Sequence, residues 1–264
     1  MKSILILVSP ESGFNARLDA ALAIVRTSGA HLTALQVVDM TMYEAYPSFA
    51  GPIYATSYLN DLEVFAREGK ERVEKRLSRE DVPWDFINLN ADHVGNALRL
   101  GSLADLIVCS QPDPLFPGFE SILMASRTPI MVVPTKLTSF DPTGRAMVAW
   151  NGSFEAANAL RAAIPLLKLS ASVTLVSVGK SGKGDFPSTD ALQYLSRHGI
   201  DAELREDTET GGFIADRLQV EATALHAAWM VLGAYSHSRT LEAVFGGVTK
   251  TMLKNMDIPM LLAR

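Results

Sequence analysis

The part of the sequence best suited to chemistry is a glycine-containing stretch near its end. The stretch runs from Gly233 to Ser236, continues for nine residues and resumes at Gly246, Gly247 and Thr249. An apolar run precedes it and a helical pattern follows, so a strand would lead into a helix N-terminus. Backbone N–H groups converge there, the helix dipole favours negative charge, and glycine lets the backbone approach a phosphate closely. The stretch predicts an anion site with the Thr249 hydroxyl in the first helical turn. The alternative is that the paired glycines only begin the last helix. Spacing alone does not distinguish it from an anion site.

Other motifs with a chemical meaning fail on their spacing. Gly179-Lys180-Ser181 resembles the end of a phosphate-binding P-loop, but Thr174 stands where that motif needs glycine. Gly182-Lys183-Gly184 lacks the third glycine of a dinucleotide fingerprint, because position 187 is proline. The five histidines and the single cysteine show no metal-ligand spacing, and no serine lies in a Gly-x-Ser-x-Gly elbow. With no pair suited to acid–base or nucleophilic catalysis, we expect a protein that is not an enzyme.

Composition and charge exclude several classes of partner. The 264 residues carry a formal net charge of -5, which argues against nucleic acid as the main partner. No segment approaches the roughly 18 apolar residues of a membrane span, and the run Ile4–Val8 is too short for a signal peptide. Cys109 has no partner for an internal disulfide and fits a reducing compartment. We expect a cytoplasmic protein that binds neither nucleic acid nor membrane.

The strongest pattern is an internal repeat. Each half holds short apolar runs in the same order, offset by 142 residues at the first run and by 130 at the last. These runs are continuous rather than alternating, which is typical of parallel strands covered by helices on both faces. The predicted strands are 4–8, 32–38, 106–109 and 130–133 in the first copy and 146–150, 173–178, 229–232 and 260–262 in the second.

Helices and loops are placed between these runs. Alanine-rich stretches predict helices over 16–27 and 156–167, and an apolar stripe at three- and four-residue spacing predicts one over 61–77. Residues 40–60, with five aromatic residues and two prolines, predict a packed loop or lid that lengthens the first copy. The copies join through 135–145, where Asp141-Pro142-Thr143-Gly144 predicts a turn.

The repeat and the glycine stretch together resemble the universal stress protein family in its tandem form. The motifs that carry the resemblance are Val148-Ala-Trp-Asn-Gly-Ser153, Gly233-Ala-Tyr-Ser-His-Ser-Arg239, Phe245-Gly-Gly-Val-Thr249 and Pro259-Met-Leu-Leu262. The resemblance covers nearly the whole chain. It implies an α/β fold of two tandem Rossmann-like domains of the adenine nucleotide alpha hydrolase-like type. Each would be a five-stranded, mainly parallel sheet with helices on both faces, the two packed as a pseudo-dimer. The expected bounds are 1–138 and 144–264.

The resemblance also implies a binding site in the second copy. Carried over by position, the base would lie by Ala149, Asn151 and Val178, and the phosphate cradle would comprise Gly233, Ser236, His237, Gly246, Gly247 and Thr249. Three residues differ from the family's pattern. Asn151 stands in place of an aspartate, Ser236 in place of a glycine, and Gly247 in place of a serine or threonine. In the first copy Cys109-Ser110 replaces the glycine that ends strand four, and three prolines in 111–118 remove N–H donors. We expect the first copy to hold no phosphate cradle.

The function that follows is stress-linked adenine-nucleotide sensing. We expect ATP or another adenine nucleotide, one per chain at most, with Mg²⁺ as a companion ion, and coupling to an unidentified protein partner or to homodimerisation. One alternative is an interaction module that binds no nucleotide. Another is a small-ligand binder that uses the aromatic segment 43–58 as a lid. A weak nucleotide hydrolase is least favoured, because no base or metal ligand can be named.

Overall fold

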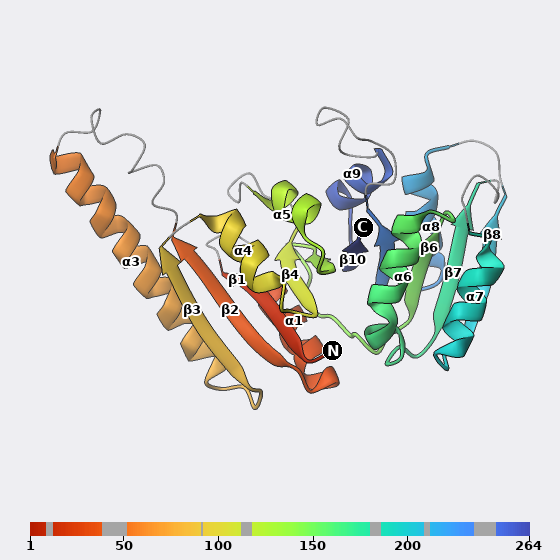
Figure 1. Ribbon diagram of the computed structural model, residues 1–264, viewed down its shortest axis with the longest axis horizontal. Coiled ribbons are helices and arrows are strands. Elements are labelled where there is room, and N and C mark those ends of the chain that lie inside the picture. The colour runs from red at the N-terminus through yellow and green to blue at the C-terminus, as the bar shows by residue number, and fades with distance from the viewer. Residues whose placement is uncertain are drawn as a thin grey trace.

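In the part of the chain that the structure describes, ten strands form one continuous sheet (Figure 1). The computed structural model describes residues 1–8, 13–38, 52–90, 92–111, 118–179, 186–208, 212–234 and 247–264. Along the sheet the strand order is β3-β2-β1-β4-β5-β10-β9-β6-β7-β8. Each copy therefore contributes five neighbouring strands, and within each copy all pairings are parallel. The predicted α/β fold class is confirmed.

The elements follow the predicted runs closely. The strands are β1 Ser3–Val8, β2 His31–Val38, β3 Trp84–Asn90, β4 Leu106–Ser110, β5 Ile130–Val133, β6 Ala146–Trp150, β7 Val173–Val178, β8 Ala202–Asp207, β9 Trp229–Gly233 and β10 Met260–Ala263. The helices are α1 Phe14–Ser28, α3 Pro52–Leu77, α4 His93–Gly101, α5 Phe119–Ala125, α6 Phe154–Leu167, α7 Ser188–Arg197, α8 Ile214–Ala224 and α9 Gly247–Lys254.

The copies meet through their last strands. β10 pairs antiparallel with β5, in the register Met260↔Val132, Leu261↔Met131 and Leu262↔Ile130. We expect this contact from the family resemblance and because a strand that ends a sheet exposes unpaired backbone groups, which pairing with its twin satisfies. The prediction is confirmed, and the shared register makes one sheet out of two repeats.

Helices cover both faces of this sheet. One apolar cluster joins the strands to α1, α3, α6 and α7, and the other joins them to α4, α5, α8 and α9. β1, β4, β5 and β6 are buried at nearly every residue, as their uninterrupted apolar sequences predict. Figure 1 shows α3 running along β3 at one end of the sheet and α7 lying by β8 at the other.

The link between the copies forms the predicted turn. The backbone N–H and the hydroxyl of Thr143 donate to Asp141 Oδ1 at 2.9 and 2.6 Å, and the Gly144 N–H donates to the Asp141 carbonyl at 3.1 Å. The two hydrogen bonds from Thr143, led by that of its hydroxyl, lower the pKa of Asp141 below its usual value. The expected bounds 138 and 144 both fall in the connection between β5 and β6. The division into two domains stays a prediction.

One expectation is wrong. The sequence predicts a loop over residues 40–60 and a helix from 61, whereas α3 already begins at Pro52. Proline suits the first position of a helix, because its missing N–H has no intrahelical partner there and its fixed φ is helical. The proline therefore starts a helix rather than marking a loop. Residues 39–51 and 180–185 lie outside the described residues. In the described part of the chain, no helix combines the length and apolarity that crossing a membrane requires.

Candidate functional site

The topology alone singles out one place for a ligand in each copy. From β6 the chain continues to β7 and β8 on one side, then crosses over to β9 and β10 on the other side. The boundary between β6 and β9 is therefore a topological switch point, and open α/β sheets bind ligands beyond the carboxyl ends of the strands there. The first copy has the same boundary between β1 and β4.

In the second copy, a tight turn leaves β6 at the switch point. Asn151 is exposed and its Oδ1 accepts a hydrogen bond from the Ser153 N–H at 3.1 Å. Gly152 has φ of 74°, a conformation that favours glycine. The Ser153 hydroxyl then caps α6 by accepting from the Ala156 N–H at 3.1 Å. The Asn151 oxygen thus holds the turn. Among the described residues, its NH₂ group has no hydrogen-bond partner.

The other residues predicted to surround the base lie on β6 and β7. Ala149 is buried in β6, and Val178 is the half-buried last residue of the neighbouring strand β7. Trp150 pairs with Ser177 in the parallel register, so both strands end at the same edge of the sheet. The structure brings Ala149, Asn151 and Val178 to this edge.

The structure gives Gly233, predicted to belong to the phosphate cradle, a packing role. A Cβ on Gly233 would lie 2.5 Å from the Ala156 nitrogen and 2.7 Å from the Glu155 carbonyl carbon. Because these are backbone atoms, they cannot move aside without shifting α6. Glycine is therefore required at the end of β9 for the start of α6 to pack this closely. Contact of Gly233 with a phosphate stays a prediction.

Gly247 and Thr249 both lie in the first turn of α9. A Cβ on Gly247 would meet no atom within 4 Å, so packing does not require glycine there. Thr249 is only 5% exposed, on the side of α9 that faces the core. The remaining predicted site residues Ser236, His237 and Gly246 lie outside the described residues.

In the first copy, side chains occupy the matching position. Arg17 in α1 is 1% exposed, its Nη1 donates to Ser110 Oγ at 2.7 Å, and its guanidinium carbon lies 5.5 Å from the Phe14 ring centroid. Ser110 is the last residue of β4, and a Cβ on Gly13 would lie 2.8 Å from its hydroxyl. Sequence reasoning did not single out Arg17 or Gly13. The available signal was an arginine at an apolar position of the alanine-rich helix.

The register of the sheet gives a residue-by-residue match between the copies. Ile4 pairs with Leu106 as Ala146 pairs with Trp229, so Ser110 corresponds to Gly233. An offset of 142 residues superposes the burial patterns of α1 and α6, matching Arg17 to Ala159 and Gly13 to Glu155. In both copies a glycine makes the close contact between strand and helix possible. In the second copy it is Gly233 at the end of the strand, and in the first copy it is Gly13 before the helix.

No cluster of metal ligands is present in the part of the chain that the structure describes. Among those residues, no three His, Cys, Asp or Glu side chains converge as a metal ion would need. The described part of the site therefore does not fit a metal held by the protein's own side chains, and we assign Mg²⁺ no ligand in this chain.

Comparison with known proteins places the fold. No family model and no curated protein matches the chain. A universal stress protein from Archaeoglobus fulgidus is similar over 99% of this chain and 97% of its own, with a TM-score of 0.77 and 14% identity. A universal stress protein described as putative, from Pseudomonas aeruginosa, is similar over 100% and 93%, with a TM-score of 0.62 and 16% identity. The chain has the Rossmann-like tandem fold of these universal stress proteins.

A similar fold also occurs in a domain of a transport protein. The cytoplasmic domain of a prokaryotic cation chloride cotransporter is similar over 99% of this chain and 94% of its own, with a TM-score of 0.51 and 10% identity. Fold similarity at these identities does not carry a ligand or an activity from one protein to the other. The functional argument therefore rests on the residues at the switch points.

Proposed function

We propose that this chain is a stress-response protein of the universal stress type that binds one adenine nucleotide in its second copy and acts as a sensor or regulator. The observation that carries the proposal is the difference between the two switch points. Arg17 and Ser110 fill the one in the first copy, whereas Ala159 and Gly233 stand at the same positions in the second. The second switch point thus lacks the two side chains that the first one holds.

Each part of the second site has a chemical role in this proposal. The base lies by Ala149 and Val178, and the free NH₂ of Asn151 donates to a ring nitrogen of adenine. The phosphates lie at the N-terminus of α9, where backbone N–H groups and the helix dipole favour an anion. Because Thr249 is buried, the backbone donors carry most of this contact and the hydroxyl is secondary.

Titration calorimetry with ATP tests the proposal. Wild-type protein is expected to bind one ATP per chain. In Gly247→Val, a branched side chain stands at the helix start among the N–H groups, and ATP affinity is expected to fall about tenfold or more. Folding should survive, because a Cβ at Gly247 meets open space. Gln193→Val, at an exposed position of α7, is the matched control and should bind as wild type.

Two results contradict the proposal. One is no saturable ATP binding by the wild-type protein at millimolar concentration. The other is unchanged affinity in a well-folded Gly247→Val variant, which would remove the start of α9 from the site. Mass spectrometry of the small molecules that co-purify gives an independent check, because adenine nucleotide is expected among them.

The second candidate function is an interaction module that binds no nucleotide. The observation that favours it is an exposed apolar surface at the start of α8, where Phe213, Ile214 and Val220 are 78%, 46% and 66% exposed. Exposed apolar side chains that gather on one element are typical of contact surfaces. Failure of ATP to bind would favour this candidate. The aromatic segment 43–58, the basis of a third interpretation, begins outside the described residues and its role stays a prediction.

A further inference from the structure

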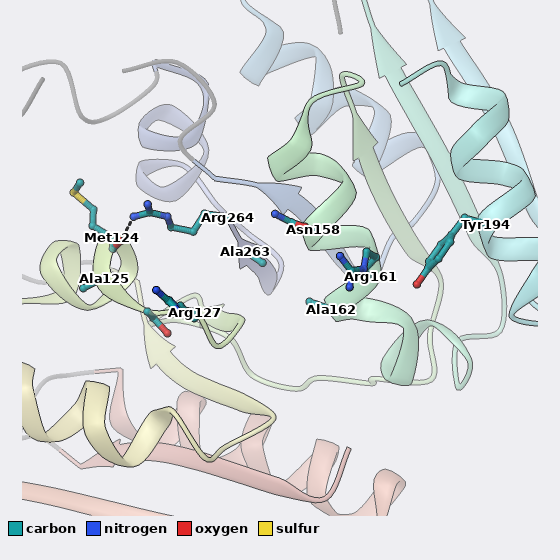
Figure 2. A pocket seen from close by; sticks show the side chains of 10 residues that line it. Met124, Ala125, Arg127, Asn158, Arg161, Ala162, Tyr194, Ala263 and Arg264 are labelled. Carbon is teal, nitrogen blue, oxygen red and sulfur yellow. Dashed lines mark hydrogen bonds between the residues drawn. The ribbon is translucent and has the colours of Figure 1, made fainter. Parts of the chain in front are cut away.

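A polar groove lies at the seam between the two copies. It has a volume of about 820 Å³ and is walled by residues of both copies, among them Arg127, Asn158, Arg161, Tyr194 and Arg264. Figure 2 shows Arg127 on the loop that leads into β5, Arg161 and Asn158 on α6, and Arg264 at the end of β10. Among the described residues, none of those predicted to bind the nucleotide lines it.

The chemistry of the groove is that of hydrogen-bond donors. Three guanidinium groups are permanently charged and can only donate, and the Asn158 amide and the Tyr194 hydroxyl add neutral donors. Among the described residues, no Asp or Glu side chain lines the groove. Within the described residues, Arg127 and Arg161 take part in no ion pair and no side-chain hydrogen bond. Their charges are thus available to a ligand.

Local hydrogen bonds order the backbone turn at Arg127 and the side chain of Arg264. The Ser126 hydroxyl accepts from the Thr128 N–H at 3.1 Å and donates to the Thr128 carbonyl at 2.8 Å, which fixes the turn that carries Arg127. Arg264 donates through Nη1 to the Met124 carbonyl, a bond that spans the seam (Figure 2). Donors fixed in advance lose less conformational entropy when a ligand arrives.

The fold does not require arginine at the positions of Arg127 and Arg161. By the register of the last strands, Arg127 corresponds to Asp257, and by the helix offset Arg161 corresponds to Asp19. The positions that match Arg127 and Arg161 in the other copy are therefore occupied by carboxylates. One of them, Asp19, forms an ion pair with Arg76 at 2.9 Å. The concentration of arginine is specific to one groove of a nearly symmetric molecule.

We propose that this seam groove binds a small molecule that carries two or more phosphate groups. The planar fork of arginine matches phosphate geometry through paired N–H donors, and three such forks suit several phosphates better than one. The groove volume lies within the range of about 300 to 1,000 Å³ typical of small-molecule sites. The ligand would contact both copies, so its binding would stabilise the seam.

Titration calorimetry with inorganic triphosphate at low ionic strength tests the proposal. Wild-type protein is expected to bind one triphosphate, and the double variant Arg127→Gln/Arg161→Gln is expected to bind it about tenfold or more weakly. The matched control is Arg67→Gln/Arg79→Gln, which removes two exposed arginines far from the groove and should bind as wild type. Orthophosphate, with a single phosphate group, is expected to bind much more weakly than triphosphate to the wild type.

The outcomes separate this site from the proposed nucleotide site. The proposed cradle at α9 also contacts phosphate, so arginine dependence identifies the groove: triphosphate affinity is expected to fall by a larger factor in Arg127→Gln/Arg161→Gln than in Gly247→Val. ATP that competes for the arginine-dependent site would make the nucleotide's own phosphate chain a ligand of the groove, in keeping with the proposal. The proposal is overturned if wild-type protein shows no saturable triphosphate binding, if both double variants lose affinity equally, or if only Gly247→Val loses it.

Discussion

The two switch points of this molecule share one topology but differ in what fills them. In the first copy, Arg17 lies buried against Ser110, and Gly13 makes room for the serine. In the second, Gly233 ends the strand and the backbone of α6 closes directly over it. The fold thus requires only that one partner in the contact be small. Which partner is small decides where a side chain fits: the first copy places Ser110 at the end of its strand, and the second has Gly233 there.

The largest loss of stability is expected when the serine that ends β4 is placed at the matching position of β9. Gly233→Ser places a Cβ 2.5 Å from a backbone nitrogen, and such overpacking should lower the free energy of unfolding by about 3 kcal/mol. Denaturant unfolding measures the change. Gly247→Ser is the matched control, since a Cβ there meets nothing, and should cost less than about 0.5 kcal/mol. Similar costs for the two variants would show that the close contact is not rigid.

The next effect is expected at the buried arginine. Arg17→Ala removes the guanidinium from Ser110 and leaves unfilled space in the core, so we expect a loss of about 2 kcal/mol in the free energy of unfolding. Arg67→Ala, at an exposed position of α3, serves as the control and should be nearly neutral. An Arg17→Ala protein as stable as wild type would mean that Arg17 does not hold the first switch point closed.

A smaller loss of stability is expected from substituting Gly13, the glycine of the first copy's contact. A Cβ on Gly13 meets side-chain atoms, Ser110 Oγ at 2.8 Å and Thr135 Cγ2 at 2.9 Å, which can move more easily than backbone. Gly13→Ala should therefore cost about 1 kcal/mol, less than Gly233→Ser. In a double-mutant cycle with Ser110→Gly, part of that cost should disappear. Strict additivity of the two changes would contradict the proposed contact.

The smallest effect concerns another difference between the copies. Asp105 accepts hydrogen bonds from the backbone N–H groups of Lys2 and Ser3, whereas Ala228 stands at the matching position. These bonds, led by that of Lys2, lower the pKa of Asp105 below its usual value. Since a lowered pKa favours the folded state only while the carboxyl is ionised, this stabilisation is present above about pH 4 and is lost as the pH falls through the lowered pKa.

Asp105→Asn tests this point. We expect it to cost less than about 1 kcal/mol near pH 7, because the carboxylate is largely exposed to solvent. The difference from wild type should shrink as the pH falls below 4, and unfolding measured across that range follows it. A difference that is independent of pH would assign the effect to lost packing rather than to the ionised carboxylate.

The sequence predicted the strands of the buried sheet but not its edges. The apolar runs 130–133 and 146–150 coincide with β5 and β6, because a strand buried on both faces must be apolar throughout. No such run marks β8, where Glu203, Leu204 and Arg205 are exposed at one edge of the sheet. The start of α3 was missed because aromatic residues and prolines were interpreted as a loop, although Pro52 is suited to begin a helix.

The candidate site was predictable only in part. The motif at 148–153 located the turn after β6. Gly233 was predicted to contact a phosphate, and the structure shows instead its close contact with the backbone of α6. The neighbour that makes this glycine necessary, the backbone of Ala156, lies in a distant part of the chain and does not follow from spacing. The same holds for Arg17, whose partner Ser110 is 93 residues away. Whether an arginine in a helical pattern is buried depends on such tertiary partners.

The central claim, a single adenine-nucleotide site in the second copy, is tested most directly by photolabelling. The protein is irradiated with an azido-adenine analogue of ATP and digested, and the labelled peptides are mapped by mass spectrometry. The account predicts that label falls within residues 144–264, on peptides that contain Ala149–Asn151 or Val178, and that unlabelled ATP prevents it. Label of equal yield within residues 1–138, or none that ATP can prevent, would contradict it.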